Sequence, residues 1–356
     1  MEDQYCLAQR ISCREKEFSM YQTKRFGKRY VEYRRAYETA ADLSNIPSFP
    51  LYITIETSHK CNLNCISCVA HGPRYKDVKS ELDSKSTIGI MDMSVLDTIL
   101  DQAKEYCLSS IGLNWLGEPT LAKDLELRIQ KCVNAGIMDV LMSTNGMLID
   151  ELLSKQIIQA GLTHMLFSID AASEETYELI RLNGDFKRVN RNIETFIKVR
   201  NQITGNVHPL TRASLVPSKL NQKEIGKFVE KYSKIVDYVE IQPFFNNFFR
   251  LNDLVADKAK KVSFKCKEVF TKLNIDSNGD VHPCCSIYGR DIILGNIKND
   301  DLKDIFTTNP ILVMLRKEIS KNIYSLEQCK LCQQSMYRLN INDSHTKNST
   351  ELPVLS

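Results

Sequence analysis

The stretch Cys61-Asn62-Leu63-Asn64-Cys65-Ile66-Ser67-Cys68 is the most informative part of this chain. It directly follows the apolar, β-branched run at 51–56, which opens after Pro50 and is typical of a strand. Three thiols on the loop after a strand can hold three irons of a four-iron cluster, which leaves the fourth iron open for chemistry. A structural zinc site takes four closed ligands, usually as two Cys-x-x-Cys pairs, and only His59 or His71 lies nearby as a fourth. The spacing therefore favours a cluster, with zinc as the alternative.

Length and composition set the class of protein. The chain has 356 residues, 43% of them hydrophobic and 26% charged, which is enough for one large domain or for one domain plus a smaller one. A formal net charge of +3 gives no reason to expect a polyanionic partner. No apolar run is long enough to span a bilayer, and the first residues lack a signal pattern. We therefore expect a cytoplasmic protein whose 12 cysteines are ligands and thiols rather than disulfides.

Strand and helix patterns alternate from residue 51 onward. The predicted strands are 51–56, 110–115, 138–143, 164–169, 211–216 and 237–242. The predicted helices between them are 92–107, 121–135, 148–160, 173–203 with a break at Asn183-Gly184, and 220–234. Such alternation predicts the α/β class and a parallel sheet with right-handed crossovers. Six units fall short of a full eight-unit barrel, so we expect a partial (β/α)6 TIM-like barrel with its functional loops at the C-terminal ends of the strands.

The remaining regions of the chain show other patterns than the alternation of strands and helices. Residues 1–50 are expected to form a helical N-terminal extension, and its basic, aromatic stretch at 24–35 is interpreted as a helix packed on the main domain rather than as a nucleic-acid contact. Residues 70–90 read as a long polar loop that covers a site. A hairpin is expected at 269–282, where Asn278-Gly279 is a strong turn signal, with two short helices after it. The expected domains are a barrel at 51–255, a small α+β domain at 256–338 and a flexible tail at 339–356.

The cysteine spacing on a post-strand loop resembles that of radical S-adenosylmethionine (SAM) enzymes. The segment Leu116-Gly117-Glu118-Pro119, at the end of the next strand, is similar to the Gly-Gly-Glu-Pro motif of that family, with Leu116 in the first position. Gly117 lets the backbone approach closely, and Glu118 can accept hydrogen bonds from the ammonium of SAM. The resemblance covers 51–335. It implies a 4Fe-4S cluster held by Cys61, Cys65 and Cys68, with the amine and carboxylate of SAM on the open iron.

A second cysteine set lies near the C-terminus. It consists of Cys266, Cys284 or Cys285, and the pair Cys329-Lys330-Leu331-Cys332. The pair alone is a weak signal because zinc sites use it too. The whole set, with the stretches 278–285 and 294–297, resembles the twitch module, a shortened SPASM domain that holds one auxiliary 4Fe-4S cluster by four cysteines. The family pattern favours Cys284 as the ligand, and zinc remains the alternative.

Side-chain alternation proposes further SAM contacts on the later strands. Ser168 and Asp170 share one face, and so do Arg212 and Ser214 on the next strand. We interpret the first two as residues near the ribose of SAM and Arg212 as a partner of its carboxylate, with a structural salt bridge as an equal alternative. The residue before the third cysteine is often large in this family, whereas here it is Ser67, so the adenine must be held differently.

The stretch at 241–250 follows the last barrel strand. It carries two phenylalanine pairs and ends at Arg250. At the mouth of a barrel these residues could line a substrate pocket, with Arg250 as a catalytic residue. Packing between the two domains is an equal interpretation for the phenylalanines.

The resemblance implies reductive cleavage of SAM and abstraction of a hydrogen atom from the substrate, with a reductant such as flavodoxin or ferredoxin. In relatives with one auxiliary cluster, such as the aminoglycoside-pathway alcohol dehydrogenases, that cluster accepts a second electron. We therefore expect dehydrogenation of a small polar substrate, a sugar or cyclitol. The N-terminal segment is too short for the leader-peptide-binding domain of many peptide-modifying relatives. No membrane or nucleic-acid partner is expected.

Three alternatives stay open. The first is a sugar epimerase in which Cys285 donates a hydrogen atom to the substrate radical, although a buried packing role for this thiol is the plainer interpretation. The second is an enzyme that modifies a peptide or protein side chain. The third is a non-catalytic cluster-binding protein, which the combination of Glu118 with the three clustered cysteines disfavours.

Overall fold

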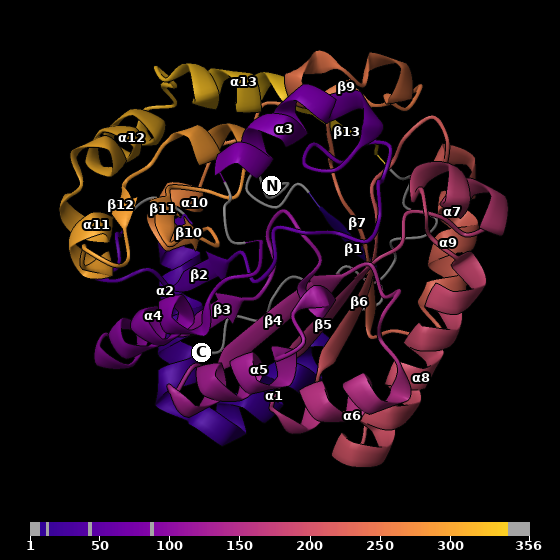
Figure 1. The fold of residues 1–356 in the computed structure, drawn as a ribbon, viewed down its shortest axis with the longest axis horizontal. Helices are drawn as coiled ribbons and strands as arrows, with labels where there is room; N and C mark the ends of the chain where they lie inside the picture. Colours follow the sequence, from indigo (N-terminus) through magenta and orange to yellow (C-terminus); the bar gives the residue numbers. More distant parts are fainter. Residues whose placement is uncertain (1–7, 12–13, 42–44, 86–88, 341–356) are drawn as a thin grey trace.

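Six parallel strands form the centre of the molecule (Figure 1). The computed structural model describes residues 8–11, 14–41, 45–85 and 89–340. The six strands are β2 (Tyr52–Ile55), β3 (Ser110–Gly112), β4 (Asp139–Thr144), β5 (His164–Ser168), β6 (Leu210–Leu215) and β7 (Tyr238–Ile241). Each pairs in parallel with the next along the chain. The predicted partial barrel is therefore confirmed.

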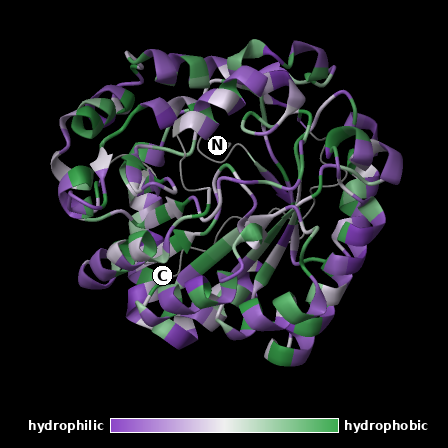
Figure 2. Cartoon of the chain, viewed as in Figure 1, coloured by the Kyte–Doolittle hydropathy of each residue, from purple (hydrophilic) through white to green (hydrophobic). Residues whose placement is uncertain are grey.

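Helices cover the outer face of this sheet. They are α4 (Met93–Glu105), α5 (Leu125–Asn134), α6 (Glu151–Gln159), α7 (Glu174–Ile180), α8 (Phe186–Thr204) and α9 (Ile225–Tyr232). Asp150 caps α6 and Ser173 caps α7, because each side chain accepts a hydrogen bond from a first-turn amide. The predicted break before α8 is confirmed, and Asn183 there has φ +69°. Figure 2 shows hydrophobic residues along the central strands and mixed polarity on the surrounding helices.

Strand register decides which side chains point into the barrel. Phe167 packs edge to face on Phe196 of α8, so it points outward. Its neighbour Ser168 therefore points inward. Residues paired across parallel strands point to the same side, so the register extends the inner face around the barrel. The inner face is polar at the positions Lys272, Asn274, Tyr52, Thr54, Ser143, Ser168, Arg212, Ser214 and Glu240.

The N-terminal helices α1 (Glu15–Phe26) and α2 (Lys28–Ala41) cover the N-terminal ends of the strands. Gln22 donates a hydrogen bond to the Asp139 carboxylate at 2.8 Å, and Tyr30 and Tyr33 of the basic stretch are buried. Their burial supports the packing interpretation over a nucleic-acid contact. Strand β1 (Gln9–Ile11) pairs antiparallel with β7 and was not expected, because three residues are too few to show an alternating pattern.

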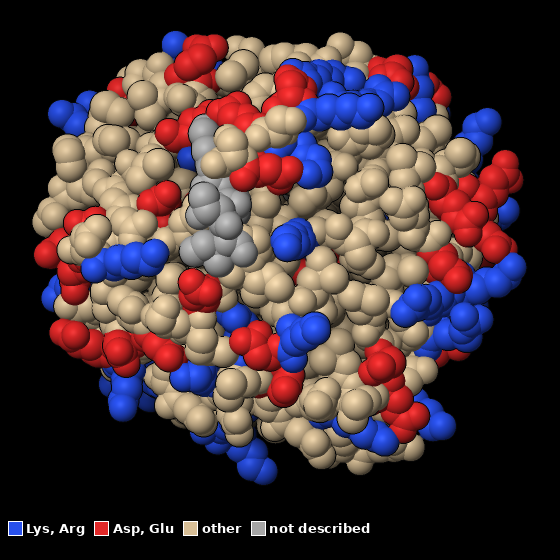
Figure 3. Space-filling view, in the orientation of Figure 1, with Lys and Arg blue, Asp and Glu red and all other residues tan. Residues whose placement is uncertain are grey.

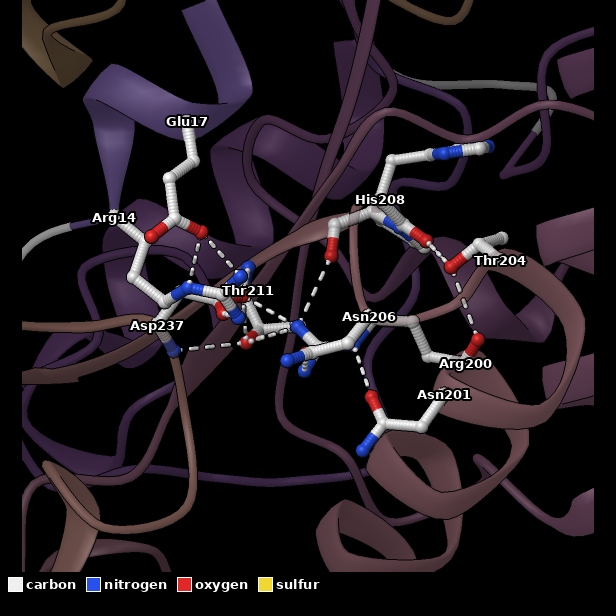
Figure 4. A network of polar contacts seen from close by, with 10 residues as sticks. Arg14, Glu17, Arg200, Asn201, Thr204, Asn206, His208, Thr211 and Asp237 are labelled. Carbon is white, nitrogen blue, oxygen red and sulfur yellow. Dashed lines mark hydrogen bonds and ion pairs between the residues drawn. The ribbon is translucent and has the colours of Figure 1, made fainter. Parts of the chain in front are cut away.

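A buried polar network anchors this end of the barrel (Figure 4). The Asp237 carboxylate, just before β7, accepts hydrogen bonds from the Thr211 amide and hydroxyl, both at 2.7 Å. The same carboxylate forms ion pairs with Arg200 of α8 and with Arg14, just before α1. The network therefore ties together two strands, an outer helix and the N-terminal helices.

We expect Asp237→Ala to lower the free energy of unfolding by about 3–5 kcal/mol, because it leaves the buried Arg200 guanidinium without its counter-charge. Urea unfolding of the anaerobically purified protein measures this change. Glu230→Ala is the matched control, since Glu230 and its partner Lys234 are 74% and 70% exposed and such pairs contribute under about 1 kcal/mol. Equal destabilisation by both variants would contradict the anchoring role.

The C-terminal region continues the barrel sheet instead of forming a separate one. Strand β10 (Lys272–Ile275) pairs in parallel with β2, and β11 (Asp280–His282) and β12 (Gly295–Asn296) follow it. The predicted hairpin is confirmed, except that its first residues form the short helix α10 (Glu268–Thr271). The helices here are α10, α11 (Leu302–Thr308), α12 (Pro310–Ser320) and α13 (Glu327–Ser335). A second small sheet joins β8 (Phe244–Phe245), β13 (Met336–Arg338) and β9 (Lys260–Lys261).

The expected covering loop at 70–90 is largely helical, which corrects the sequence-based interpretation. It contains a 3-10 turn at Pro73–Tyr75 and helix α3 (Lys76–Lys85). The helix was missed because its apolar residues are few and Tyr75, just before it, supplies the buried contact. Most of the expected tail, from residue 341, lies outside the described residues.

Candidate active site

The loop that carries Cys61, Cys65 and Cys68 lies at the C-terminal end of β2. The loop is held by backbone hydrogen bonds from Asn64 to Leu182 at 3.1 Å and from Ile66 to Ile180 at 2.9 Å. The three thiols are free and only partly buried. Burial and the neighbouring Glu118 and cysteines raise the pKa of the Cys61 thiol to about 12. A buried thiolate needs a positive partner, which iron supplies, so the donor set fits a cluster.

The segment Gly117-Glu118 packs directly against this loop. A Cβ at Gly117 would lie 2.2 Å from the carbonyl oxygen of Ser58, so only glycine fits here. The Glu118 amide donates to the Lys60 carbonyl at 2.8 Å, which places the predicted SAM motif one residue from Cys61. The buried Glu118 carboxylate accepts hydrogen bonds from Thr144 at 2.7 Å and from the Asn145 amide at 2.8 Å. Pro119, next in the chain, is buried and begins the following turn.

Two asparagines beside this motif were missed by sequence reasoning. Asn145 follows β4 and donates a hydrogen bond to the side chain of Asn62, between the cysteines, at 2.9 Å. Its amide nitrogen also lies 4.0 Å from Cys61 Sγ. The only signal in the sequence was the turn Asn145-Gly146 after a predicted strand.

The predicted SAM contacts on the later strands are found in two different environments. Ser168 and Ser214 are paired in register on the inner face, and the Ser214 hydroxyl donates a hydrogen bond to the Phe167 carbonyl at 3.3 Å. Asp170 has φ +67° and forms an ion pair with Arg181 at 2.6 Å, and it also accepts from the Val216 amide at 2.8 Å. These contacts are structural, so the ribose role of Asp170 stays a prediction with a competing explanation.

Arg212 forms an ion pair with Glu240, whose side chain is 4% exposed. This is the salt bridge that the sequence left open as an alternative. Arg181, at the end of α7, lies nearer the cysteine loop, because its Nη1 is 3.7 Å from Cys65 Sγ. Among the residues that the structure describes, the buried Nε of Arg181 and that of Arg212 both lack a hydrogen-bond partner, so the distance to Cys65 is what distinguishes the two arginines. Arg181 is therefore better placed than Arg212 to meet a carboxylate at the first cluster.

The cysteines of the C-terminal set line a single cavity. Cys266 precedes α10, Cys284 follows β11, and Cys329 and Cys332 lie on α13. Apolar residues, among them Phe264 and Pro283, complete the lining. Burial raises the pKa of the Cys329 thiol to about 11, so here too the thiols fit a site that supplies positive charge.

Gly289 leaves room in this cavity for the sulfur atom of Cys284. A Cβ at Gly289 would lie 2.3 Å from Cys284 Sγ. Within the described part of the chain, no three His, Cys, Asp or Glu side chains converge on a single metal ion. Zinc would draw its sulfurs to about 2.3 Å from one centre, whereas a cluster binds each cysteine at a different iron.

Cys285 points away from this cavity. Its thiol contacts the Glu268 carboxylate at 3.4 Å, and the residue is exposed. Its carbonyl accepts a hydrogen bond from the Trp115 indole at 2.8 Å, which connects the auxiliary segment to the loop before Gly117. The two adjacent cysteines thus lie in different environments, and the ligand role of Cys284 stays a prediction.

A buried charged network lies between the two cysteine sites. Glu56, at the end of β2, accepts from the Ser277 amide at 3.2 Å and lies 3.5 Å from the Arg290 guanidinium. It also contacts His59 at 3.1 Å, and the other ring nitrogen of His59 faces Asp83 at 3.2 Å. Because both of its nitrogens are engaged, His59 is poorly placed to be a fourth ligand of the first site.

Arg250, which we expected at the mouth of a substrate pocket, is found in a cluster of ion pairs, and its catalytic role stays a prediction. Arg250 forms an ion pair with Asp77 of α3, and Arg74 forms a matching pair with Asp253. Each arginine also donates to the backbone carbonyl of the other at 3.3 Å. We call these four residues the arginine clasp. It holds α3 to the segment after β7, and Arg250 thereby acts at the surface.

Both parts of the chain match known family models. Residues 55–212 match the model of the Radical SAM superfamily, and residues 266–333 match SPASM, an iron-sulfur cluster-binding domain. A Clostridium botulinum protein named GTP 3′,8-cyclase is 26% identical over 201 residues, which is 54% of this chain and 56% of that protein. A protein of the same name from Desulforamulus reducens is 26% identical over 196 residues, 54% of this chain and 55% of that protein. The chain thus spans about half the length of these curated relatives.

Solved structures share the fold at low sequence identity. Streptococcus suis SuiB is 18% identical with a TM-score of 0.56, covering 90% of this chain and 81% of that one. The protein anSMEcpe with bound AdoMet is 20% identical with a TM-score of 0.54, covering 80% and 89%. BtrN in complex with AdoMet and 2-DOIA is 16% identical with a TM-score of 0.50, covering 76% and 87%. At these identities the likeness concerns the fold alone.

Proposed function

We propose, on the premise that this chain is a radical SAM protein with a C-terminal SPASM domain, that it oxidises a small polar substrate, a sugar or cyclitol. The family matches imply a 4Fe-4S cluster and SAM at the barrel and auxiliary iron-sulfur binding at the C-terminal domain. When bound, the first cluster supplies the electron that splits SAM into methionine and a 5′-deoxyadenosyl radical, which takes a hydrogen atom from an unactivated carbon. An external reductant such as flavodoxin or ferredoxin delivers that electron.

Different residues around the first site bind the cluster and the different groups of SAM. Cys61, Cys65 and Cys68 hold the cluster, and Glu118 accepts from the ammonium of SAM. Arg181 pairs with its carboxylate, a role that the sequence had suggested for Arg212. Ser168 and Ser214 lie at the mouth of the barrel, on the inner face, for the ribose. Their task is to hold SAM against the open iron and to keep water away from the radical.

The proposed substrate class rests on the polarity of the inner face of the barrel. Its strands present hydroxyl, amide and charged groups where many barrels pack branched apolar side chains. A hydroxyl-rich substrate can satisfy such groups, whereas an apolar substrate would leave them unpaired. Oxidation of a secondary alcohol to a ketone would then balance: the hydroxyl loses its proton, and an auxiliary cluster held by the C-terminal cysteines would supply an acceptor for the remaining electron.

The test is substrate-dependent SAM cleavage. The reduced, reconstituted protein is incubated anaerobically with SAM and a set of sugars and cyclitols, and 5′-deoxyadenosine and ketone are measured together. We expect one ketone for each additional 5′-deoxyadenosine. Cleavage that no sugar or cyclitol stimulates would overturn the proposed substrate class. Cleavage stimulated by a peptide instead would favour side-chain modification.

Epimerisation is the second candidate, because Cys285 is an exposed residue that does not line the auxiliary cavity. A hydrogen atom from this thiol would quench the substrate radical with inverted configuration, and one electron from the external reductant with one proton from solvent would return the resulting Cys285 thiyl radical to the thiol, so the substrate undergoes no net oxidation. In deuterium oxide an epimerase places one deuterium at the inverted carbon, and Cys285→Ala stops the inversion but not the abstraction. A ketone product that forms normally in Cys285→Ala excludes this role.

A variant pair separates the two candidate arginines. We expect Arg181→Met to raise the Kd for SAM at least tenfold, because a charge-assisted hydrogen bond to the carboxylate is lost. Arg212→Met should change the Kd less than threefold, since Glu240 retains its contact with Arg10 at 3.0 Å. Equilibrium dialysis with labelled SAM on iron-replete protein measures both values. The reverse order would restore the sequence-based assignment of Arg212.

A further inference from the structure

One ion pair lies on the inner face of the barrel without a role in the sites described so far. Lys272 of β10 is paired in register with Tyr52 of β2. The next residues on these strands, Leu273 and Ile53, are fully buried in the hydrophobic core. Because side chains alternate along a strand, Lys272 and Tyr52 point to the opposite side, into the barrel.

Lys272 and Glu268 form a close pair beside Cys285. The Lys272 ammonium lies 2.5 Å from the Glu268 carboxylate, and the two side chains are 14% and 25% exposed. The same carboxylate contacts the Cys285 thiol at 3.4 Å, and the ammonium lies 5.5 Å from the centre of the Tyr52 ring. Burial disfavours the charged form, but Glu268, together with Cys285 and the neighbouring tyrosines Tyr37 and Tyr52, holds the pKa of Lys272 well above its usual value. The lysine is therefore a permanent cation and hydrogen-bond donor.

Room around this pair depends on one glycine. A Cβ at Gly112 of β3 would lie 2.0 Å from the Tyr52 hydroxyl. Gly112 therefore lets the Tyr52 hydroxyl reach across the inner face of the neighbouring strand. The result is a wall of one ammonium, one carboxylate, one phenol and one thiol, contributed by β2, α10, β10 and the segment after β11.

Each cation named on the inner face contacts a carboxylate, and one of these carboxylates, Glu240, serves two arginines. Lys272 has Glu268 as its partner, and Arg212 has Glu240. Arg10 of β1 shares Glu240, at 3.0 Å. Recognition of a phosphate or triphosphate needs cations that are not already neutralised. Charged side chains that are already paired instead suit a neutral molecule. Hydrogen bonds from a partly buried ion pair to such a molecule offset part of the free energy that desolvation of the pair costs.

We propose that Lys272 and Glu268 bind two neighbouring polar groups of the substrate beside Cys285, and that the substrate is an unphosphorylated polyol or aminopolyol. The ammonium donates to one substrate oxygen, and the carboxylate accepts from an adjacent hydroxyl or amino group. The inference rests on the proposed function and narrows its substrate class. It also sets this chain apart from relatives named for GTP, whose substrate carries three phosphates.

The experiment uses the reduced holoprotein with SAM and two matched sets of probes. One set is unphosphorylated, represented by myo-inositol and glucosamine, and the other is phosphorylated, represented by glucosamine 6-phosphate and GTP. The rate of 5′-deoxyadenosine formation is measured against probe concentration. We expect stimulation within the unphosphorylated set only.

Variants of Lys272 are then compared with the most active probe. Lys272→Met should raise KM at least tenfold and change kcat less than threefold, and Lys272→Arg should recover part of the loss. Lys321→Met is the matched control, because Lys321 is exposed at the end of α12 and should leave KM unchanged. If Lys272→Met loses iron, Lys272→Gln is judged by the same criterion.

The outcomes separate this inference from the proposed function. Stimulation by phosphorylated probes alone overturns the inference, while hydrogen abstraction from a sugar stands. An unchanged KM in an iron-replete Lys272→Met protein overturns the binding role of the pair. SAM cleavage that no probe of either set stimulates overturns both the inference and the proposed substrate class.

Discussion

Replacing Cys61, Cys65 and Cys68 together with alanine is expected to lower the iron content of the anaerobically reconstituted protein from about eight to about four atoms per chain. SAM cleavage should fall to the background rate. The loop would lose all three ligands of the site beside Glu118, while the four cysteines around the C-terminal cavity remain. Without the open iron, SAM has neither an anchor for its amine and carboxylate nor a source of the electron that splits it.

Iron analysis and 5′-deoxyadenosine formation after reduction measure this result. Cys107→Ala is the control, because Cys107 is a free, exposed cysteine at the end of α4 and should alter neither quantity. SAM cleavage that persists in the triple variant would overturn the assignment of the first site.

Replacing Cys329 and Cys332 with alanine should have the complementary effect. Both residues line the C-terminal cavity from α13, so their loss removes half of its four cysteines and the auxiliary cluster with them. Iron should again fall from about eight to about four atoms. Turnover of the substrate should be lost, because the second electron has no acceptor. Uncoupled SAM cleavage should survive, because it needs only the first site.

Elemental analysis decides this second case. Loss of iron together with the auxiliary spectroscopic signal is the expected result. Loss of zinc instead would show that the cavity is a zinc site, and loss of substrate-free SAM cleavage would show that the two sites are not independent. Comparison with the triple variant shows which signal belongs to which site.

The barrel could be predicted closely because its signals are local. The bounds of each of the six parallel strands lie within three residues of those expected, since a short apolar run between turn residues is typical of a strand. Helix α3 and strand β1 were missed for the opposite reason. Both are short and polar, and they owe their structure to distant partners, Asn247 for the Tyr75 hydroxyl next to α3 and β7 for β1.

The candidate cysteine ligands could be selected from the sequence, whereas the residues around them could not. The cysteine spacing and the Leu116-Gly117-Glu118-Pro119 segment can be recognised from the sequence alone. The position of Arg181 cannot, because Arg181 lies beside Cys65 only through the way α7 ends, 116 positions later in the chain. The inner-face position of Lys272 depends in the same way on the parallel pairing of β10 with β2, which joins strands over 200 residues apart.

The pairing of β10 with β2 also determines how the two cysteine sites can move. The three cysteines of the first site lie on the loop after β2. Cys284 of the second site lies just after β11, the strand that follows β10. Four registered residue pairs and the Glu56 contacts to Ser277 and Arg290 join these strands. Opening one site relative to the other would break that ladder, which belongs to the most stable part of a fold. We therefore expect the separation between the Cys61 loop and Cys284 to be fixed by the sheet, whatever the length or flexibility of the chain that connects the domains.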